Sequence, residues 1–302
     1  MKNKVIIGGL FALGIILLIG FFCVQVGKKI FDRTPETVET NVNRPVERPP
    51  GLPPAQPTTP EEARRIYLAL GNPSNADASS PNNYLMVNNY YAVSYSRDRA
   101  IPNWAAWRVT KADRGDTDRV DSFRPDDRLP KGWAQVKPSD YTGSGYDRGH
   151  LAPNADKNAN PDSMASTFLM TNMTPQMPDL NRGPWEKLES YLRTLVTRGN
   201  DIYIFAGVYG DKGKLKNKVT IPTNNWKAAV AVPAGSDISA VNENTRVIAV
   251  DMPNVKGIKN ADWQTYRTTV RDIEQKTGYN LFSNLPQNLQ DALETKKDDI
   301  NN

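Results

Sequence analysis

The chain has 302 residues, of which 38% are hydrophobic and 24% charged, the composition of a globular protein with one large domain or two small ones. The formal net charge of +5 suits a polyanionic partner without requiring one. A single cysteine, Cys23, excludes intrachain disulfides, and a single histidine, His150, excludes zinc sites built from Cys and His clusters. Any imidazole chemistry therefore falls to His150.

The N-terminal segment contains an uncharged run, residues 5–27, with lysines on both sides. A run of about 20 apolar residues matches the hydrocarbon core of a membrane. This one is longer than the apolar region of a secretion signal and lacks a small-x-small cleavage site, so we expect residues 1–30 to form an uncleaved membrane anchor. A cleaved secretion signal is the alternative, and lysines at both ends leave the orientation open.

Residues 31–75 have the composition of a linker. Eight prolines and almost no large apolar residues lie between positions 35 and 60, which is typical of an extended, semi-rigid spacer. Toward the end of this stretch we expect a short helix at 61–70. A loop rich in Ser, Asn, Asp and Pro should follow at 72–83.

Residues 76–302 are predicted to form one α+β domain, with a mostly antiparallel central sheet flanked by helices. Runs of aromatic and β-branched residues predict strands at 90–95, 104–110, 202–208, 226–232 and 246–251. Helices are predicted at 184–198 and 263–276. The first has Pro184 in its first turn and Gly199 just past its end, and its apolar residues recur at helical spacing on one face.

The segment Asp147-Arg148-Gly149-His150 carries the strongest chemical signal. Arg148 and His150 are two residues apart, so on an extended segment their side chains share a face. That arrangement would place a cation for phosphate beside a base for water. A lone histidine is more often structural, so the segment gains weight from a second one downstream, Asp179-Leu180-Asn181-Arg182-Gly183-Pro184-Trp185.

Together these segments resemble the DNA/RNA non-specific endonuclease family, which has the ββα-metal fold. The family signature pairs Asp-Arg-Gly-His with a downstream Asn-x-Gly-x-Trp segment or a close variant. The resemblance is nearest to a cyanobacterial secreted member and spans about 90–293, including stretches at 119–125, 143–146 and 245–250. It does not cover the apolar run or the proline-rich linker.

The resemblance implies that His150 is the general base and that Asn181 is the only protein ligand of Mg²⁺, for which Mn²⁺ could substitute. Glu189 would bind water molecules that coordinate the metal, and Asn172 would hold the site residues in position without binding the metal itself. This agrees with the chemistry of Mg²⁺, which prefers oxygen ligands and keeps several waters. A neutral imidazole near its ordinary pKa of about 6.5 suits a base at neutral pH.

Three arginines would bind phosphate according to the same resemblance: Arg148, Arg193 and Arg119, the last through a loop match. The planar guanidinium matches phosphate oxygens bidentately. Glu189 and Arg193 are four residues apart on the predicted helix and therefore lie on one face. The alternative for this pair is a surface ion pair without function.

The implied function is Mg²⁺-dependent cleavage of DNA and RNA to 5′-phosphate ends. Contacts to the backbone carry no base information, so little sequence preference is expected. The alternative is a membrane-tethered nucleic-acid-binding module without catalysis. Because a non-specific nuclease would damage its own cytoplasm, we expect the catalytic domain to be periplasmic or extracellular, whether anchored or secreted. The existence of a protein inhibitor is left open.

Other features are expected to be ordinary. Three tryptophans are expected in the core rather than on a base-stacking surface: Trp104, Trp107 and Trp226. Asp147 should orient the backbone or Arg148 rather than bind metal. Lys212, Lys214, Lys216 and Lys218 predict a solvated turn, with contact to a nucleic-acid backbone as the alternative. The tail around Asp298 and Asp299 is expected to be frayed.

Overall fold

The computed structural model describes residues 57–300. The predicted membrane anchor at 1–30 and most of the predicted linker lie outside the described residues. Within 57–300, no helix is both long enough and apolar enough to cross a membrane. The anchor therefore stays a prediction.

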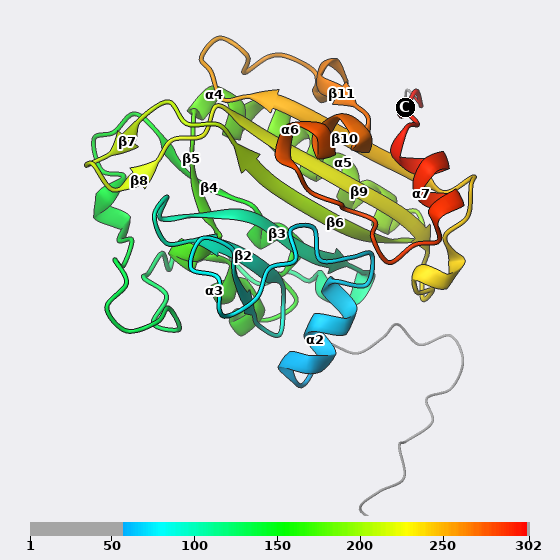
Figure 1. The fold of residues 1–302 in the computed structure, drawn as a ribbon, viewed down its shortest axis with the longest axis horizontal. Coiled ribbons are helices and arrows are strands. Elements are labelled where there is room, and N and C mark those ends of the chain that lie inside the picture. Colours follow the sequence, from blue (N-terminus) through cyan, green and yellow to red (C-terminus); the bar gives the residue numbers. More distant parts are fainter. Residues whose placement is uncertain (1–56, 301–302) are drawn as a thin grey trace, which may run out of the picture. The chain divides into compact units, whose positions relative to one another are not determined.

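A seven-stranded antiparallel sheet forms the centre of the fold, in the order β1-β2-β3-β6-β9-β10-β11 (Figure 1). Its strands are β1 (Tyr84–Val87), β2 (Ala92–Ser96), β3 (Ile101–Val109), β6 (Asn200–Tyr209), β9 (Asn224–Pro233), β10 (Arg246–Pro253) and β11 (Arg267–Thr268). Helices flank this sheet, so the predicted α+β class with a mostly antiparallel sheet is confirmed.

Both faces of the central strands are covered. Every residue of β3 is buried. Successive side chains of a strand point to opposite faces, and accordingly Trp104 donates from Nε1 to Ser74 Oγ at 2.8 Å while Trp107 donates to Asp156 Oδ2 at 3.0 Å. The predicted core tryptophans Trp104, Trp107 and Trp226 are all fully buried.

The five predicted strands all exist, and four of them are observed close to the predicted ranges. The strand predicted at 90–95 begins only at Ala92. Asn88 Oδ1 accepts hydrogen bonds from the backbone N–H groups of Tyr90 and Tyr91 at 2.7 and 2.9 Å, which holds both residues in a turn. Neither β1 nor the short hairpins were predicted, because two- to four-residue strands carry too little periodicity.

The helix predicted at 184–198 is confirmed as α5 (Glu186–Thr197), preceded by a π-helical turn, η5 (Asn181–Trp185). Gly183 within that turn has φ −124° and ψ −118°, outside the helical region, so the chain kinks there. A side chain at Gly183 would meet the backbone of Lys259 at 2.6 Å. The apolar face of α5 is buried and packs against β6.

The helix predicted at 263–276 is wrong in its first half. Residues Trp263–Tyr266 form a 3₁₀ turn, η7, and residues 267 and 268 pair with β10 as β11. The helix α6 (Val270–Thr277) starts where Thr269 Oγ1 accepts from the backbone of Asp272 at 3.0 Å and Asp272 accepts from the backbone of Thr269 at 3.1 Å. This capping box fixes the helix start four residues beyond the 3₁₀ turn.

Helix α2 (Pro60–Tyr67) belongs to the folded body although it lies in the stretch predicted as linker. Thr59 caps it by accepting from the backbone of Glu62 at 3.1 Å. Ala63 and Tyr67 are buried in the main core, as is Leu70 beyond the helix end. The folded body thus begins before residue 76, where the sequence placed the domain boundary.

The element that positions the site is a second, two-stranded antiparallel sheet, β4 (Asp147–His150) paired with β5 (Met173–Gln176), followed by α5. This order is the ββα unit expected from the resemblance. Between these strands lie η3 (Asn154–Asp156), α3 (Pro161–Thr167) and η4 (Met170–Asn172), and α4 (Pro178–Leu180) precedes η5. The remaining elements are η1 (Lys111–Asp113), η2 (Pro138–Asp140), the hairpin β7 (Lys214–Leu215) and β8 (Val219–Thr220), η6 (Ile238–Ala240) and α7 (Gln287–Glu294).

The C-terminal tail is not frayed at Asp298, contrary to the prediction. Asp298 is buried and accepts from Arg246 Nε at 2.9 Å, and Arg267 lies 3.3 Å from its other oxygen. Two arginines on neighbouring strands thus compensate the buried carboxylate and hold the tail against the edge of the sheet.

Candidate active site

His150 is the last residue of β4 and is half-buried. Its ring lies against two aromatic rings, with centroid distances of 5.6 Å to Phe123 and 5.1 Å to Phe168. The buried Nε2 atom has no hydrogen-bond partner among the described residues. Sequence reasoning did not single out either phenylalanine, although Phe123 belongs to the 119–125 stretch that carries the resemblance.

Burial, with Arg119 and Arg148 nearby, lowers the pKa of His150 to about 3, although Asp121 acts in the opposite direction. Burial and positive neighbours both disfavour the imidazolium. The expectation of a pKa near the ordinary value is therefore wrong. The consequence is an imidazole that is neutral throughout the physiological pH range.

Arg148 shares a face with His150, as their spacing predicted. The Arg148 guanidinium lies 4.3 Å from the centroid of the Phe123 ring, so both side chains meet the same phenylalanine. Gly149 between them is required by packing, because a Cβ at this position would lie 2.1 Å from Gln176 Oε1. The close approach of Gln176 on β5 therefore explains why this position of the Asp-Arg-Gly-His segment is a glycine.

Asn181 is fastened to the first residue of β4. Its Nδ2 donates to Asp147 Oδ2 at 3.0 Å, and Arg182 forms a bidentate contact with the same carboxylate at 2.8 and 2.6 Å. Asp147 therefore orients Asn181 and Arg182, and not the backbone or Arg148 as predicted. The NH₂ group of Asn181 is engaged by Asp147, and its amide oxygen accepts no hydrogen bond from residues 57–300.

Glu189 on α5 is buried and accepts from Lys227 Nζ at 3.1 Å. Lys227 comes from β9, is 1% exposed, and lies 4.3 Å from the Trp185 ring centroid. Burial raises the pKa of Glu189, an effect that Asp156 increases and that Lys227 and Arg193 oppose. Lys227 escaped sequence reasoning because it is a single lysine in a strand, with no signal that it would be buried against Glu189.

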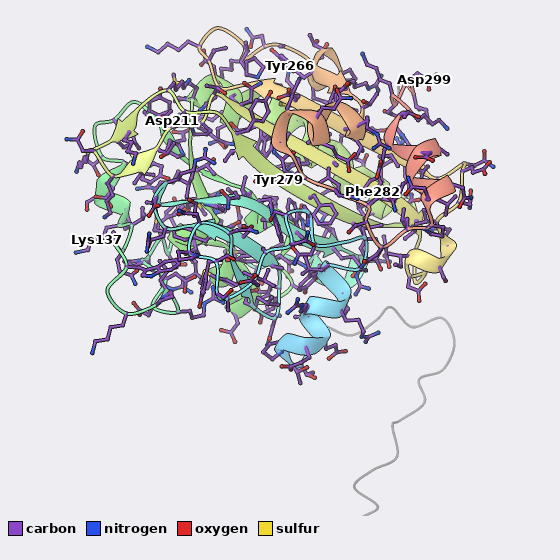
Figure 2. The ribbon with its side chains drawn as sticks, in the orientation of Figure 1. Lys137, Asp211, Tyr266, Tyr279, Phe282 and Asp299 are labelled. Atoms are coloured by element: carbon purple, nitrogen blue, oxygen red, sulfur yellow. The ribbon has the colours of Figure 1, made fainter. Side chains whose placement is uncertain are left out.

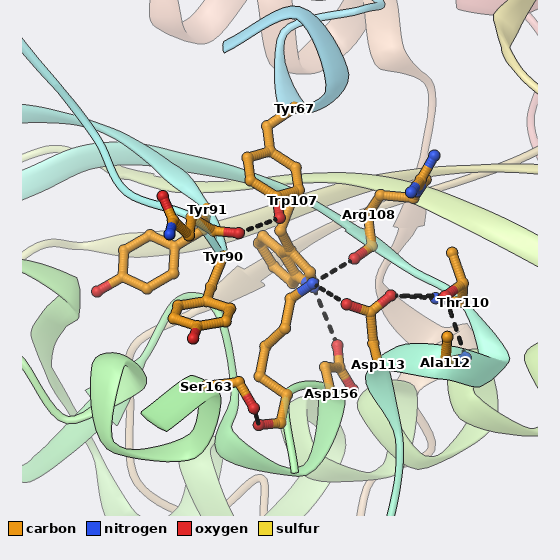
Figure 3. A network of polar contacts seen from close by, with 12 residues as sticks. Tyr67, Tyr90, Tyr91, Trp107, Arg108, Thr110, Ala112, Asp113, Asp156 and Ser163 are labelled. Carbon is orange, nitrogen blue, oxygen red and sulfur yellow. Dashed lines mark hydrogen bonds and ion pairs between the residues drawn. The ribbon is translucent and has the colours of Figure 1, made fainter. Parts of the chain in front are cut away.

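Arg193, one turn after Glu189, is held by Asp156 at the end of η3. Arg193 Nη1 donates to Asp156 Oδ1 at 3.2 Å, while Asp156 Oδ2 accepts from Trp107. Figure 3 shows this aspartate beside a second buried ion pair, in which Lys157 Nζ contacts Asp113 Oδ1 at 2.6 Å and the Arg108 carbonyl at 2.8 Å. The two buried carboxylates, Asp156 and Asp113, are each paired with a cation, and these ion pairs hold the η3 turn in place.

Arg119 is exposed and lies at the other end of the same turn. It donates from Nη1 to Asn154 Oδ1 at 3.0 Å and from Nε to Asp121 at 2.7 Å, and its guanidinium is 5.3 Å from the Phe168 ring centroid. Phe168 also touches His150. Through Asn154 and Asp156, the η3 turn thus connects two of the three predicted phosphate-binding arginines.

Asn172 is completely buried behind β4. Its Oδ1 accepts from the backbone of Ala152 at 3.0 Å, and its Nδ2 donates to the carbonyls of Ala152 and Thr167 at 2.8 and 2.9 Å. These bonds fix the chain two residues after His150. The contacts agree with a positioning role for Asn172.

The donor set suits a hard divalent cation held by few protein atoms. In the described part of the chain, no group of three or more His, Cys, Asp or Glu side chains is placed to hold a metal ion. The Asn181 amide oxygen, oriented through Asp147, is a hard oxygen ligand of the kind that Mg²⁺ prefers. A closed zinc or calcium cage does not fit these residues.

Comparisons with known proteins agree with this geometry. The model of the DNA/RNA non-specific endonuclease family matches residues 72–288. The chain is 48% identical to a nuclease of Nostoc sp. over 237 residues, covering 77% of this chain and 86% of the relative. It is 31% identical to a nuclease of Serratia marcescens, covering 76% of this chain and 84% of the relative. These matches confirm the resemblance.

A solved structure, that of the EndoG/EndoGI complex, contains a chain that superimposes with a TM-score of 0.63. The match covers 81% of this chain and 99% of that chain, at 22% sequence identity. At that identity the likeness concerns the fold, which it confirms.

Proposed function

Because this chain belongs to the family of DNA/RNA non-specific endonucleases, which are phosphodiester hydrolases, we propose that it cuts DNA and RNA with His150 as the general base and a divalent cation at Asn181. The observation that carries the proposal is the hydrogen bond from Asn181 to Asp147. It links the proposed ligand on η5 to Asp147, the first residue of the strand that ends in His150.

His150 would take a proton from the attacking water. The ring is neutral because burial and the two nearby arginines keep its pKa low. A positioned base of this kind is typically worth about 10²–10⁴ in rate. The aromatic contacts with Phe123 and Phe168 hold the ring in one orientation, so that the ring nitrogen that accepts the proton would have a fixed position relative to the attacking water.

Three arginines would hold the scissile phosphate. Arg148 projects from the same face of β4 as His150, while Arg119 and Arg193 converge on the η3 turn from the 119–125 stretch and from α5. Guanidinium groups bind phosphate oxygens bidentately and stay charged at every relevant pH. Contacts of this kind read the backbone and not the bases, which accounts for action on both DNA and RNA.

The family is one of metal-dependent nucleases, and Mg²⁺ is the cation that we propose, with Mn²⁺ as a substitute. When bound, the cation supplies positive charge next to the phosphate. Asn181 would hold it directly and Glu189 through water. Lys227 opposes the rise in the pKa of Glu189 and so favours the carboxylate that this role requires. The water oxygen would bond to phosphorus, the bond from phosphorus to the 3′ oxygen would break, and that oxygen would take a proton from a second water, leaving 5′-phosphate and 3′-hydroxyl ends.

Nicking of supercoiled plasmid, and digestion of an RNA of similar length, test the proposal with the full chain in Mg²⁺ and in EDTA. We expect both substrates to be cut in Mg²⁺ and neither in EDTA. Nucleic-acid binding without any cleavage in Mg²⁺ or Mn²⁺ would instead support the non-catalytic binding module.

We further propose that the domain acts outside the cytoplasm, attached through the N-terminal run. The support is the length of that uncharged run and the proline-rich spacer behind it. Cell fractionation followed by protease treatment of intact cells tests this. The domain should be found with the membrane and be degraded from outside, whereas recovery in the cytosol would contradict the proposal.

A further inference from the structure

The hairpin formed by β7 and β8 carries an excess of positive charge that the proposed chemistry does not use. Residues 211–220, here called the lysine hairpin, contain four lysines against one acidic residue, Asp211. Lys212, Lys214 and Lys216 are exposed. Figure 2 shows Asp211 and Lys137 at the same end of the molecule, and Lys137 adds another exposed cation there.

The turn is exposed to solvent, as the sequence predicted, and its lysines also contact neighbouring loops. Lys214 Nζ donates to the Asp98 carbonyl at 3.1 Å and Lys216 Nζ to the Ser139 carbonyl at 2.6 Å. Lys218 contacts the Asp140 carboxylate at 2.7 Å. An ammonium group has three donors, so Lys214 and Lys216 keep two each for another acceptor. Their charges are therefore fixed in place and still available.

The lysine hairpin is continuous with the site. The Lys212 ammonium lies 5.7 Å from the ring centroid of Tyr146, the residue directly before β4. Lys212 also donates to the carbonyl of Asn254. Asn254 in turn donates to the Pro175 carbonyl at 2.9 Å, and Pro175 lies opposite Arg148 in the β4–β5 pair.

We propose that the lysine hairpin binds the nucleic-acid backbone beside the phosphate that is cut. The inference rests on the proposed function and extends its substrate surface by several phosphates. Three of the four lysines are exposed, and lysine binds phosphate as a point charge, so the hairpin presents several positive charges to a nucleic-acid backbone. Phosphate contacts by lysine are independent of sequence, as a non-specific nuclease requires.

The test is the double variant K214Q/K216Q, which removes two exposed charges outside the catalytic residues. Binding of a labelled duplex is measured in EDTA at several salt concentrations. Each phosphate contact contributes about 0.9 to the slope of log binding constant against log salt, so the slope should fall by about 1.8. The KM for long DNA should rise, while hydrolysis of a single-phosphodiester substrate should keep its kcat/KM.

K296Q/K297Q is the matched control, because it removes the same charge from exposed lysines just beyond α7, at the opposite end of the view in Figure 1. Its slope should equal that of the wild type, and K214R/K216R should retain binding. Equal slopes for the hairpin and control variants would overturn the inference. Absence of cleavage by the wild type would contradict the proposed function and leave the binding inference standing, because the salt dependence of binding is measured in EDTA, without catalysis.

Discussion

Arg193 and Asp156 form a buried ion pair, 3.2 Å between Nη1 and Oδ1, that joins α5 to the turn following β4. The two side chains are 13% and 3% exposed, so solvent screens the pair little. The second oxygen of Asp156 is held by Trp107 in the core of the sheet. The sheet thus fixes the carboxylate, and the carboxylate fixes the arginine that we expect to bind phosphate.

Asp156→Asn should lower kcat/KM by about 10- to 100-fold, the range that corresponds to about 1.5–3 kcal/mol for a hydrogen bond to a charged group. The same change made in an Arg193→Lys background should cost much less, because the residue to be positioned is already altered. Asp162→Asn, which removes an exposed carboxylate on α3, is the control. Equal losses in both backgrounds would show that Asp156 acts only on the fold.

His150→Ala should lower kcat by about 10²–10⁴, because no other histidine can replace the base. Duplex binding in EDTA should persist, since the arginines remain. Thermal unfolding checks that the fold is intact, which we expect because the ring nitrogen Nε2 has no partner to lose among the described residues. Turnover close to that of the wild type would refute the base assignment.

The acid limb of the pH profile should lie well below the ordinary histidine range. A general base works in its deprotonated form, and burial with Arg119 and Arg148 lowers the pKa of His150 to about 3. We therefore expect kcat/KM at saturating metal to stay level between about pH 8 and 5, where an unperturbed imidazole of pKa about 6.5 would already be protonated. Arg119→Gln should move the limb upward, and a wild-type limb centred near 6.5 would contradict the lowered pKa.

Asn181→Ala should raise the Mg²⁺ concentration needed for half-maximal cleavage, because the amide oxygen is the proposed direct ligand. Asp147→Asn should shift the same titration less, since it weakens the bond that orients the amide and leaves the amide oxygen in place. Arg182→Gln is the matched control, as it removes the other partner of Asp147 and leaves the ligand in place. Identical metal titrations for the wild type and Asn181→Ala would exclude direct ligation.

A buried carboxylate pair on α6 and α7 should make stability fall as the pH rises from about 4.3 to about 7. Burial and the neighbouring Glu274 raise the pKa of Glu294 to about 7, against the effect of Arg271. In the unfolded chain a glutamate titrates near 4.3, so the folded state retains a proton between about pH 4.3 and 7. The contribution of Glu294 to stability is therefore complete below that window and is lost as the pH rises through 7.

Glu294→Gln keeps the neutral form at every pH, so at pH 8 it should be more stable than the wild type by about 1–2 kcal/mol. The difference should shrink towards pH 5. Urea unfolding at the two pH values measures it, with the exposed Glu243→Gln as control. A variant less stable than the wild type at pH 8 would show that the ion pair with Arg271, 2.6 Å long, outweighs the burial cost.

The sequence alone determined the main secondary-structure elements and the candidate site residues, through local residue patterns and one short signature. The long strands and α5 follow from apolar periodicity and from glycine and proline at the ends, because those signals act within a few residues. The Asp-Arg-Gly-His segment and the segment around Asn181 identified the base and ligand candidates through their resemblance to a known family. The common face of Arg148 and His150 follows from strand geometry alone.

Only the tertiary structure decided the partners. Asp147 meets Asn181 and Arg182 across 34 and 35 residues, Lys227 reaches Glu189 across 38, and no local pattern encodes such distances. The low pKa of His150 likewise depends on two phenylalanines and an arginine from other segments. Burial and charge are properties of the assembled environment, so the chemical state of a residue is fixed only when distant parts of the chain enclose it.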